Sequence, residues 1–248
     1  MKIRTSLMLL TGLLATASLA YAQDTQVIAH PEETVTKIDE TMVAPRGVNH
    51  KRSPYYKMPN VFNATSSKHL TILSHYPTYQ QTTEYSCGPA VTLTVLRYYG
   101  YVDETETSLV EKMGTSTEIG THVKQIADYF GSIGWTVQTN LSSKKTFDTY
   151  EKFETFVLQE LKAKHPILVA DGAWGGHWRV IIGYDTMGTD STVDDVLIFA
   201  DPYDIGDHNQ DGYNVENGPK FFWSWFMYQL FPQNEREQPF VLAYPAKK

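Results

Sequence analysis

The chain is 248 residues long and acidic, with 28 Asp and Glu against 21 Lys and Arg and a formal net charge of −7. It has no lysine or arginine cluster longer than a pair, so nucleic-acid binding is disfavoured. This length can bury one sizeable core, and we expect a single main domain. Nothing in the composition indicates an oligomeric state.

Residues 1–22 have the pattern of a secretory signal peptide. Lys2 and Arg4 precede an apolar run, and Ala20-Tyr21-Ala22 supplies the small-x-small sequence at which signal peptidase cuts. Cleavage after Ala22 would leave a mature chain with a net charge of −9, because both basic residues are lost. No other segment approaches the roughly 20 apolar residues that a membrane span needs. We therefore expect an exported protein, periplasmic or extracellular, without stable membrane insertion after cleavage.

The stretch 23–67 is polar, contains four prolines and shows no helical or strand period. It is predicted to be an irregular N-terminal arm. A propeptide is the alternative, and no cleavage signal decides between the two. The main domain is then expected over residues 68–248.

Four segments carry signals of helices. Residues 87–99 have Pro89 in the first turn, Gly100 directly after the end, and apolar side chains around most of the circumference, which predicts a buried central helix. The other three are expected near 106–113, 121–131 and 150–164.

Short apolar runs rich in valine and isoleucine follow Pro166, at 167–170, 178–184 and 196–200, and these predict strands. Helices first and strands later are typical of an α+β fold, in which a helical half packs on an antiparallel sheet. The segment 185–195 is expected to be a surface hairpin loop.

The single cysteine, Cys87, is the first candidate for chemistry. One cysteine cannot form an internal disulfide in an exported chain, so Cys87 is either a small buried hydrophobe or a reactive thiol. Its place at the start of a helix favours the second, because unpaired backbone N–H groups and the helix dipole stabilise a thiolate there.

Three further residues complete a candidate acyl-transfer site. His177 lies between two glycines and a predicted strand, where it can act as the base. Asp201 ends the next strand, which can pair with the first and bring Asp201 to the imidazole. Gln81, six residues before Cys87, can supply an oxyanion donor, although the neighbouring Gln80 competes for that role. Alone, each has a structural alternative: a strand-end histidine, a turn cap and a loop amide.

Three sequence blocks, QTTEYSCGPAVTLTVLRYYG, GGHWRVIIGYD and LIFADPYD, resemble the motifs of the bacteriocin-processing, double-glycine-leader peptidases of the C39 type and their stand-alone relatives. That family belongs to the papain-like cysteine peptidases. The resemblance implies a papain-like fold, a peptide or protein substrate and no required cofactor. It implies Cys87 as nucleophile, His177 as base, Asp201 as the orienting acid and Gln81 at the oxyanion hole.

The resemblance has a limit. Leader peptidases usually precede a peptide-exporting transporter, whereas here a signal peptide is expected and no transporter is seen in the sequence, so cleavage after a double glycine is not implied. Peptide-bond hydrolysis is the leading function. A cysteine acyltransferase or transpeptidase on the same fold and a non-catalytic peptide-binding module are the alternatives.

A partial calcium motif lies near the C-terminus. Asp207, Asn209 and Asp211 alternate before Gly212 as in the first half of a calcium loop, but Gly218 stands where that loop carries a bidentate glutamate. The pattern therefore allows either a calcium site or a polar turn without metal.

Overall fold

The computed structural model describes residues 59–143, 147–205, 209–227 and 230–246. The predicted signal peptide and most of the predicted arm lie outside the described residues. Of that arm, the described part 59–67 contains no helix or strand, and its Val61 is buried in the hydrophobic core. No helix in the described part of the chain is long and apolar enough to cross a membrane.

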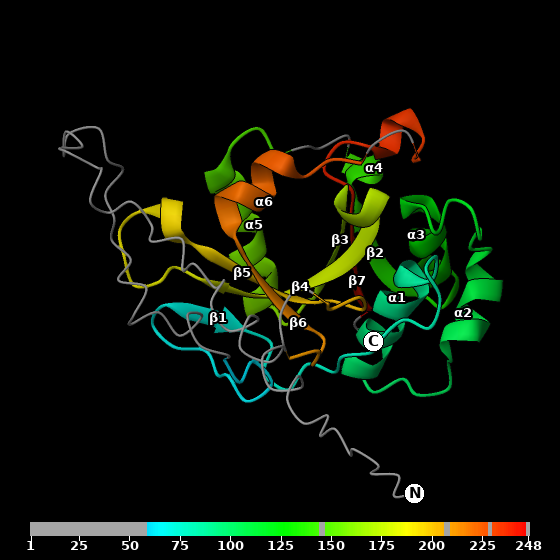
Figure 1. Ribbon diagram of the computed structural model, residues 1–248, viewed down its shortest axis with the longest axis horizontal. Helices are drawn as coiled ribbons and strands as arrows, with labels where there is room; N and C mark the ends of the chain where they lie inside the picture. The colour runs from blue at the N-terminus through cyan, green and yellow to red at the C-terminus, as the bar shows by residue number, and fades with distance from the viewer. Residues whose placement is uncertain (1–58, 144–146, 206–208, 228–229, 247–248) are drawn as a thin grey trace, which may run out of the picture. The chain divides into compact units, whose positions relative to one another are not determined.

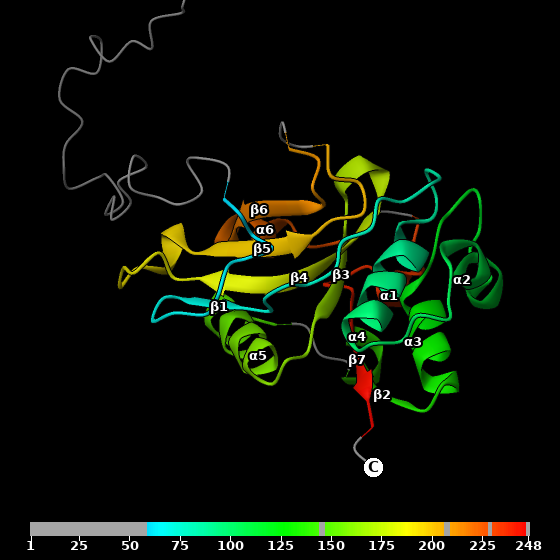
Figure 2. The ribbon, with the colours of Figure 1, turned by 90° about the horizontal axis from the view of Figure 1, so that it is seen from below.

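One antiparallel sheet organises the described chain (Figures 1 and 2). Its strands pair in the order β2-β7-β3-β4-β5-β6, and β1 pairs with β4 off this path. The strands are β1 (Leu70–Ile72), β2 (Trp135–Thr139), β3 (Ile167–Asp171), β4 (His177–Asp185), β5 (Val196–Ala200), β6 (Tyr213–Asn217) and β7 (Phe240–Pro245).

The helices form two groups beside this sheet. Figures 1 and 2 show α1, α2 and α3 together near β2 and β7, whereas α5 and α6 lie toward β4, β5 and β6. The helices are α1 (Cys87–Tyr98), α2 (Glu106–Met113), α3 (Val123–Ser132), α4 (Asn140–Ser143), α5 (Tyr150–Lys162) and α6 (Gly218–Ser224).

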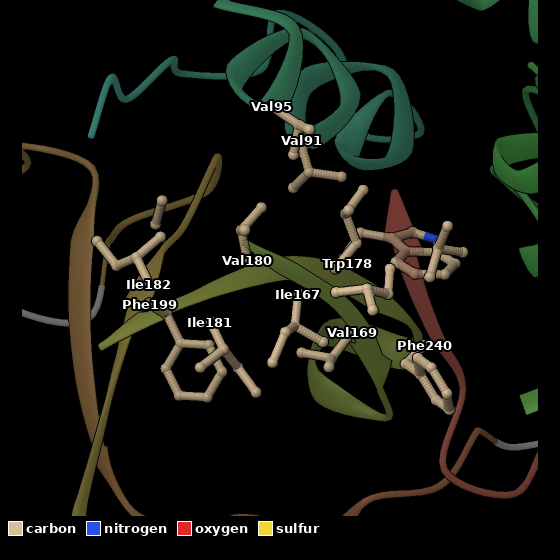
Figure 3. Close-up of a cluster of buried hydrophobic side chains, with 14 of the residues drawn as sticks. Val91, Val95, Ile167, Val169, Trp178, Val180, Ile181, Ile182, Phe199 and Phe240 are labelled. Atoms are coloured by element: carbon tan, nitrogen blue, oxygen red, sulfur yellow. The ribbon is translucent and has the colours of Figure 1, made fainter. Parts of the chain in front are cut away.

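Helix α1 is the central helix of the fold. Its first ten residues are all buried, as expected from apolar side chains that surround the helix rather than follow one stripe. Figure 3 shows Val91 and Val95 of α1 above Trp178 and Val180 of β4. The central position of the helix that begins at Cys87 is thus confirmed.

Strand β4 separates two layers because successive side chains point to opposite faces. Trp178 and Val180 face α1, whereas Ile181 points away from it, together with Phe199 of β5 (Figure 3). His177 and Arg179 alternate with Trp178 and Val180, so they belong to the face of Ile181. This alternation decides which polar side chains gather beside the candidate site.

The predicted α+β architecture is confirmed. All four expected helices and all three expected strands are present, with bounds that differ by a few residues at most. The segment 185–195 joins the antiparallel strands β4 and β5, as a hairpin loop does. Strands β1, β2, β6 and β7 and helices α4 and α6 were not predicted.

Candidate active site

His177 and Asp201 meet at one end of the sheet. His177 is the first residue of β4, Asp201 directly follows β5, and the register pairs Val180 with Ala200. That pairing brings His177 Nε2 to 2.7 Å from Asp201 Oδ1. Both side chains are buried, with 3% and 6% of their surface exposed. The hydrogen bond expected between a base and its orienting acid is therefore formed away from water.

Cys87 reaches the same imidazole from the other layer. It is the first residue of α1 and is buried, and its thiol hydrogen-bonds to His177. Because Nε2 of His177 is occupied by Asp201, Nδ1 is the ring nitrogen left for the thiol. The imidazole thus lies between a thiol and a carboxylate.

The electrostatics favour a charged imidazole. Burial alone would lower the pKa of His177, but the hydrogen bonds to Asp201 and Cys87 and their negative charges raise it to about 9. Burial would likewise raise the pKa of Asp201, yet the hydrogen bond and charge of His177 hold it below its usual value. Both shifts favour the same state, an imidazolium beside a carboxylate.

Tyr203 supports this pair and was not singled out in the sequence. Its backbone N–H donates to Asp201 Oδ1 over 2.8 Å, and its ring lies edge-on to His177 with centroids 6.3 Å apart. The only sign of Tyr203 in the sequence was its position two residues after Asp201, directly beyond Pro202. Tyr203 helps to fix the carboxylate and covers one side of the imidazole.

Gln81 is anchored beside the same turn. Its backbone N–H donates to Pro202 O over 2.8 Å, and its side-chain Nε2 donates to Thr83 O over 2.8 Å. One Nε2 hydrogen is left over, and Gln81 Oε1 is buried without a hydrogen-bond partner. Gln80, by contrast, is exposed. The half-buried Gln81 is thus held against the turn that follows Asp201, although it lines neither of the cavities beside His177, and Gln80 stays at the surface.

Two cavities flank His177. The smaller, about 270 Å³, is lined by Cys87 and His177 together with apolar side chains such as Met227 and Phe231. The larger, about 490 Å³, is lined by His177 and Asp201 but not by Cys87. The candidate site is thus open on two sides that differ in access to the thiol.

Trp174 lines both cavities. It lies in the turn between β3 and β4 with φ of 53°, a conformation that a bulky residue rarely adopts, and 67% of its surface is exposed. Its ring meets that of Tyr203 edge-on, with centroids 5.6 Å apart. The turn therefore holds an aromatic wall three residues before the imidazole.

Arg179 is a buried cation behind the pair and was also missed. Its Nη2 donates to Asp171 Oδ2 and, over 3.1 Å, to Glu216 Oε2. Its charge contributes to the lowered pKa of Asp201. The apolar surroundings of this arginine in the sequence gave no sign of the carboxylates on β3 and β6.

The calcium prediction remains a prediction. Asp207 lies outside the described residues, Asn209 Nδ2 donates to Asp211 Oδ2 over 2.7 Å, and Asp211 Oδ1 accepts from the N–H of Tyr213 over 3.1 Å. Within the described ranges no group of three or more His, Cys, Asp or Glu side chains is placed to hold a metal ion.

One solved structure supports the fold, and two others are similar with lower TM-scores. A crystal structure described as a C39-like peptidase from Bacillus anthracis has 15% sequence identity and a TM-score of 0.50, and covers 73% of this chain and 100% of its own. The peptidase domain of Streptococcus ComA, a bi-functional ABC transporter involved in quorum sensing, has 18% identity and a TM-score of 0.43, with 69% and 100% covered. A double glycine motif protease from the AMS/PCAT transporter, in complex with the leader peptide, has 14% sequence identity and a TM-score of 0.40, and the match covers 68% of this chain and 91% of that one.

The family comparison is more specific. No curated protein matches the chain. The model of the Peptidase_C39 like family, however, matches residues 72–229, a range that contains Gln81, Cys87, His177 and Asp201. The papain-like fold implied by the sequence blocks is thereby confirmed. This protein belongs to the Peptidase_C39 like family.

Proposed function

We propose that the protein is an exported cysteine peptidase that hydrolyses peptide bonds through a thioester on Cys87. One observation carries the proposal: the buried His177 ring lies between the thiol at the N-terminus of α1 and the carboxylate of Asp201. An imidazole with these two partners can hold a thiolate ready and can also release a proton.

The first half of the reaction forms the thioester. The Cys87 thiolate attacks the substrate carbonyl carbon, and the backbone N–H of Cys87 with the free Nε2 hydrogen of Gln81 stabilises the developing oxyanion. His177 then gives its proton to the leaving amine as the carbon–nitrogen bond breaks. The amine leaves, and the acyl group stays on sulfur.

Water completes the turnover. His177, now neutral, takes a proton from water, whose oxygen attacks the thioester; the carbon–sulfur bond breaks and the acid product leaves. Asp201 keeps Nε2 protonated throughout, so that Nδ1 always faces the reacting atoms. Tyr203 supports this arrangement through its N–H on the carboxylate.

Peptide-library cleavage tests the proposal. The mature protein and the Cys87→Ala variant are incubated with a diverse peptide library, and new termini are identified by mass spectrometry. We expect cleavage by the wild type alone. Absence of new termini across the library would refute peptidase activity, and products conjugated to an added amine would show a transferase instead.

Export is part of the same proposal. Lys2, Arg4 and Ala20-Tyr21-Ala22 support a cleaved signal peptide. N-terminal sequencing of the exported protein should find Gln23 first, and an intact Met1 would contradict it.

A further inference from the structure

The two cavities beside His177 differ in the part of the substrate that each can receive, and this step rests on the proposed function. The acyl group becomes bonded to Cys87, so it lies in the smaller cavity that the thiol lines. The leaving amine takes its proton from His177 as its bond to the acyl carbon breaks, and it departs on the side of the imidazole. The larger cavity, which touches His177 and Asp201 but not Cys87, therefore faces the leaving group.

Arg179 forms part of the wall of this larger cavity. Only 7% of its surface is exposed, and its guanidinium lies over the ring of Phe199, 4.1 Å from the ring centroid. Within the described part of the chain its hydrogen bonds all leave from Nη2, and Nε is enclosed without a partner. Nη1 also has no acceptor there, but it is not enclosed, so its N–H groups are available to a ligand.

The carboxylates around this arginine are already occupied. Asp171 accepts from Arg179 and, over 2.8 Å, from the N–H of Ala173. Glu216 accepts from Arg179 over 3.1 Å and from Lys220 Nζ over 3.0 Å. Each carboxylate oxygen of these two acids therefore has a partner within the protein.

Donors, by contrast, are left over. Besides Arg179 Nη1, the side-chain amide of Asn214 lines the cavity and has no hydrogen-bond partner among the described residues. Lys220 stands at the rim with 73% of its side chain exposed. The rim also carries the exposed aromatic faces of Trp174 and Phe226, suited to the apolar part of a peptide. The two acids that hold Arg179 are thus already paired, while a buried arginine, an amide and a lysine still present donors to the cavity, and such a set suits a carboxylate.

We propose that the cavity lined by Arg179, Asn214 and Lys220 binds a carboxylate on the leaving-group side of the scissile bond. The carboxylate comes either from an acidic side chain or from the C-terminus of a short leaving peptide. The enzyme thus selects substrates by the residues on the C-terminal side of the cleaved bond.

Binding of product-like peptides tests this without turnover. The Cys87→Ala protein is titrated by calorimetry with alanine tripeptides that have a free N-terminal amine and an amidated C-terminus. Each of the three positions is replaced in turn by Glu, Gln or Lys. The Gln peptides are also tested with a free C-terminal carboxylate. The best Glu amide or the free acids should bind about tenfold more tightly than the matching Gln amides, because a hydrogen bond to a charged group replaces one to a neutral group. Preference for the Glu amides indicates a side-chain carboxylate, and preference for the free acids indicates a C-terminus.

Two variants assign any preference to the cavity. Asn214→Asp places a like charge there and should abolish the preference, and Lys220→Ala should weaken it. Lys152→Ala is the matched control, because Lys152 and Lys220 are both exposed lysines paired with an acid four residues earlier in the chain, and Lys152 lines neither cavity. These changes keep the buried Arg179 network, whose loss would endanger folding.

The outcomes separate this inference from the peptidase proposal. Equal binding of Glu and Gln peptides, tighter binding of Lys peptides, or a preference that persists unchanged in Asn214→Asp overturns the carboxylate site. Equal cleavage rates for matched substrates with and without a carboxylate after the cut would keep the peptidase and contradict the site. A tenfold carboxylate preference in a protein that cleaves nothing would keep the site and refute the peptidase.

Discussion

His177 has two partners that act on it in the same direction. Asp201 at Nε2 and the sulfur of Cys87, acting as an acceptor, both favour the protonated ring, and together they outweigh the burial that would remove its charge. A protonated His177 is the form that stabilises a thiolate and can donate to the leaving amine. The raised pKa of His177 thus favours the charged ring at neutral pH.

The pH profile of kcat/KM should show this. Since the pKa of His177 is raised to about 9, activity should fall as pH rises through about 9, where the ring loses its proton. Asp201→Asn removes the carboxylate that favours the charged ring. The substitution should therefore move the alkaline limb of the profile to lower pH, and it should also lower the maximal rate. An alkaline limb at the same pH in both proteins would show that Asp201 does not tune His177.

Gln81 should act on the oxyanion and not on the thiol. Gln81→Ala removes one donor, which typically costs on the order of 100-fold to 1,000-fold in kcat. Alkylation of Cys87 by iodoacetamide should keep its wild-type rate, because His177 and α1 are untouched. Gln80→Ala is the matched control and should leave kcat unchanged, since Gln80 is exposed. A larger effect at Gln80 would reverse the assignment.

At the scale of elements, the first turn of α1 is fitted closely to the segment before α3. A Cβ added at Gly88 would meet Thr121 Cβ and Oγ1 at 2.6 Å. Thr121 cannot easily move, because its carbonyl accepts from Trp178 Nε1 over 2.8 Å and its side chain is β-branched and buried. The glycine next to Cys87 thus lets α1 approach closely enough to place the thiol.

Gly88→Ala should therefore cost about 1–3 kcal/mol of unfolding free energy by overpacking, and should lower kcat because the first turn of α1 shifts. Gly131→Ala in α3 is the control, since a Cβ there meets nothing within 4 Å. It should be neutral or stabilise by roughly 0.4–1 kcal/mol through loss of unfolded-state entropy. Urea denaturation of both variants measures the difference, and equal stability would exclude the close fit.

Prediction succeeded where one local signal decides an element. Pro89 and Gly100 bound α1, and the valine-rich runs indicate β3, β4 and β5. Prediction failed for β6, which is an edge strand of the sheet and has the mostly polar sequence YNVEN. It also failed for α6, a seven-residue helix inside an aromatic run. Pairing with β5 and packing on the sheet stabilise these two elements, and neither contribution is visible in a short window of sequence.

Some residues of the candidate site could likewise be predicted from the sequence and others could not. Cys87, His177 and Asp201 were predicted because each occupies the start or end of a recognisable element. Arg179 and Trp174 were missed, because their roles depend on strand register and turn geometry. Arg179 meets Asp171 and Glu216 only once β3, β4, β5 and β6 are assembled.

At the scale of the whole molecule, a bound ion would stabilise the fold by mass action. Asp207, Asn209 and Asp211 remain the candidates for calcium, and a ligand bound only by the native state raises stability with its concentration. We expect a higher Tm in millimolar calcium than in chelator, and a smaller difference in Asp211→Asn, which removes one charged ligand. An unchanged Tm in the wild type would leave this segment as a polar turn.

We propose that the fold assembles an ion pair of Cys87 and His177 from two layers that meet at the end of the sheet. The rate at which iodoacetamide alkylates Cys87 in the folded protein, measured from pH 5 to 9 against His177→Ala, tests this most directly. The wild type should react readily at mildly acidic pH, where an isolated thiol is almost entirely protonated, and His177→Ala should lose that reactivity. Wild-type alkylation with the pH dependence of a free thiol, the same in both proteins, would contradict the account and favour a non-catalytic peptide-binding module.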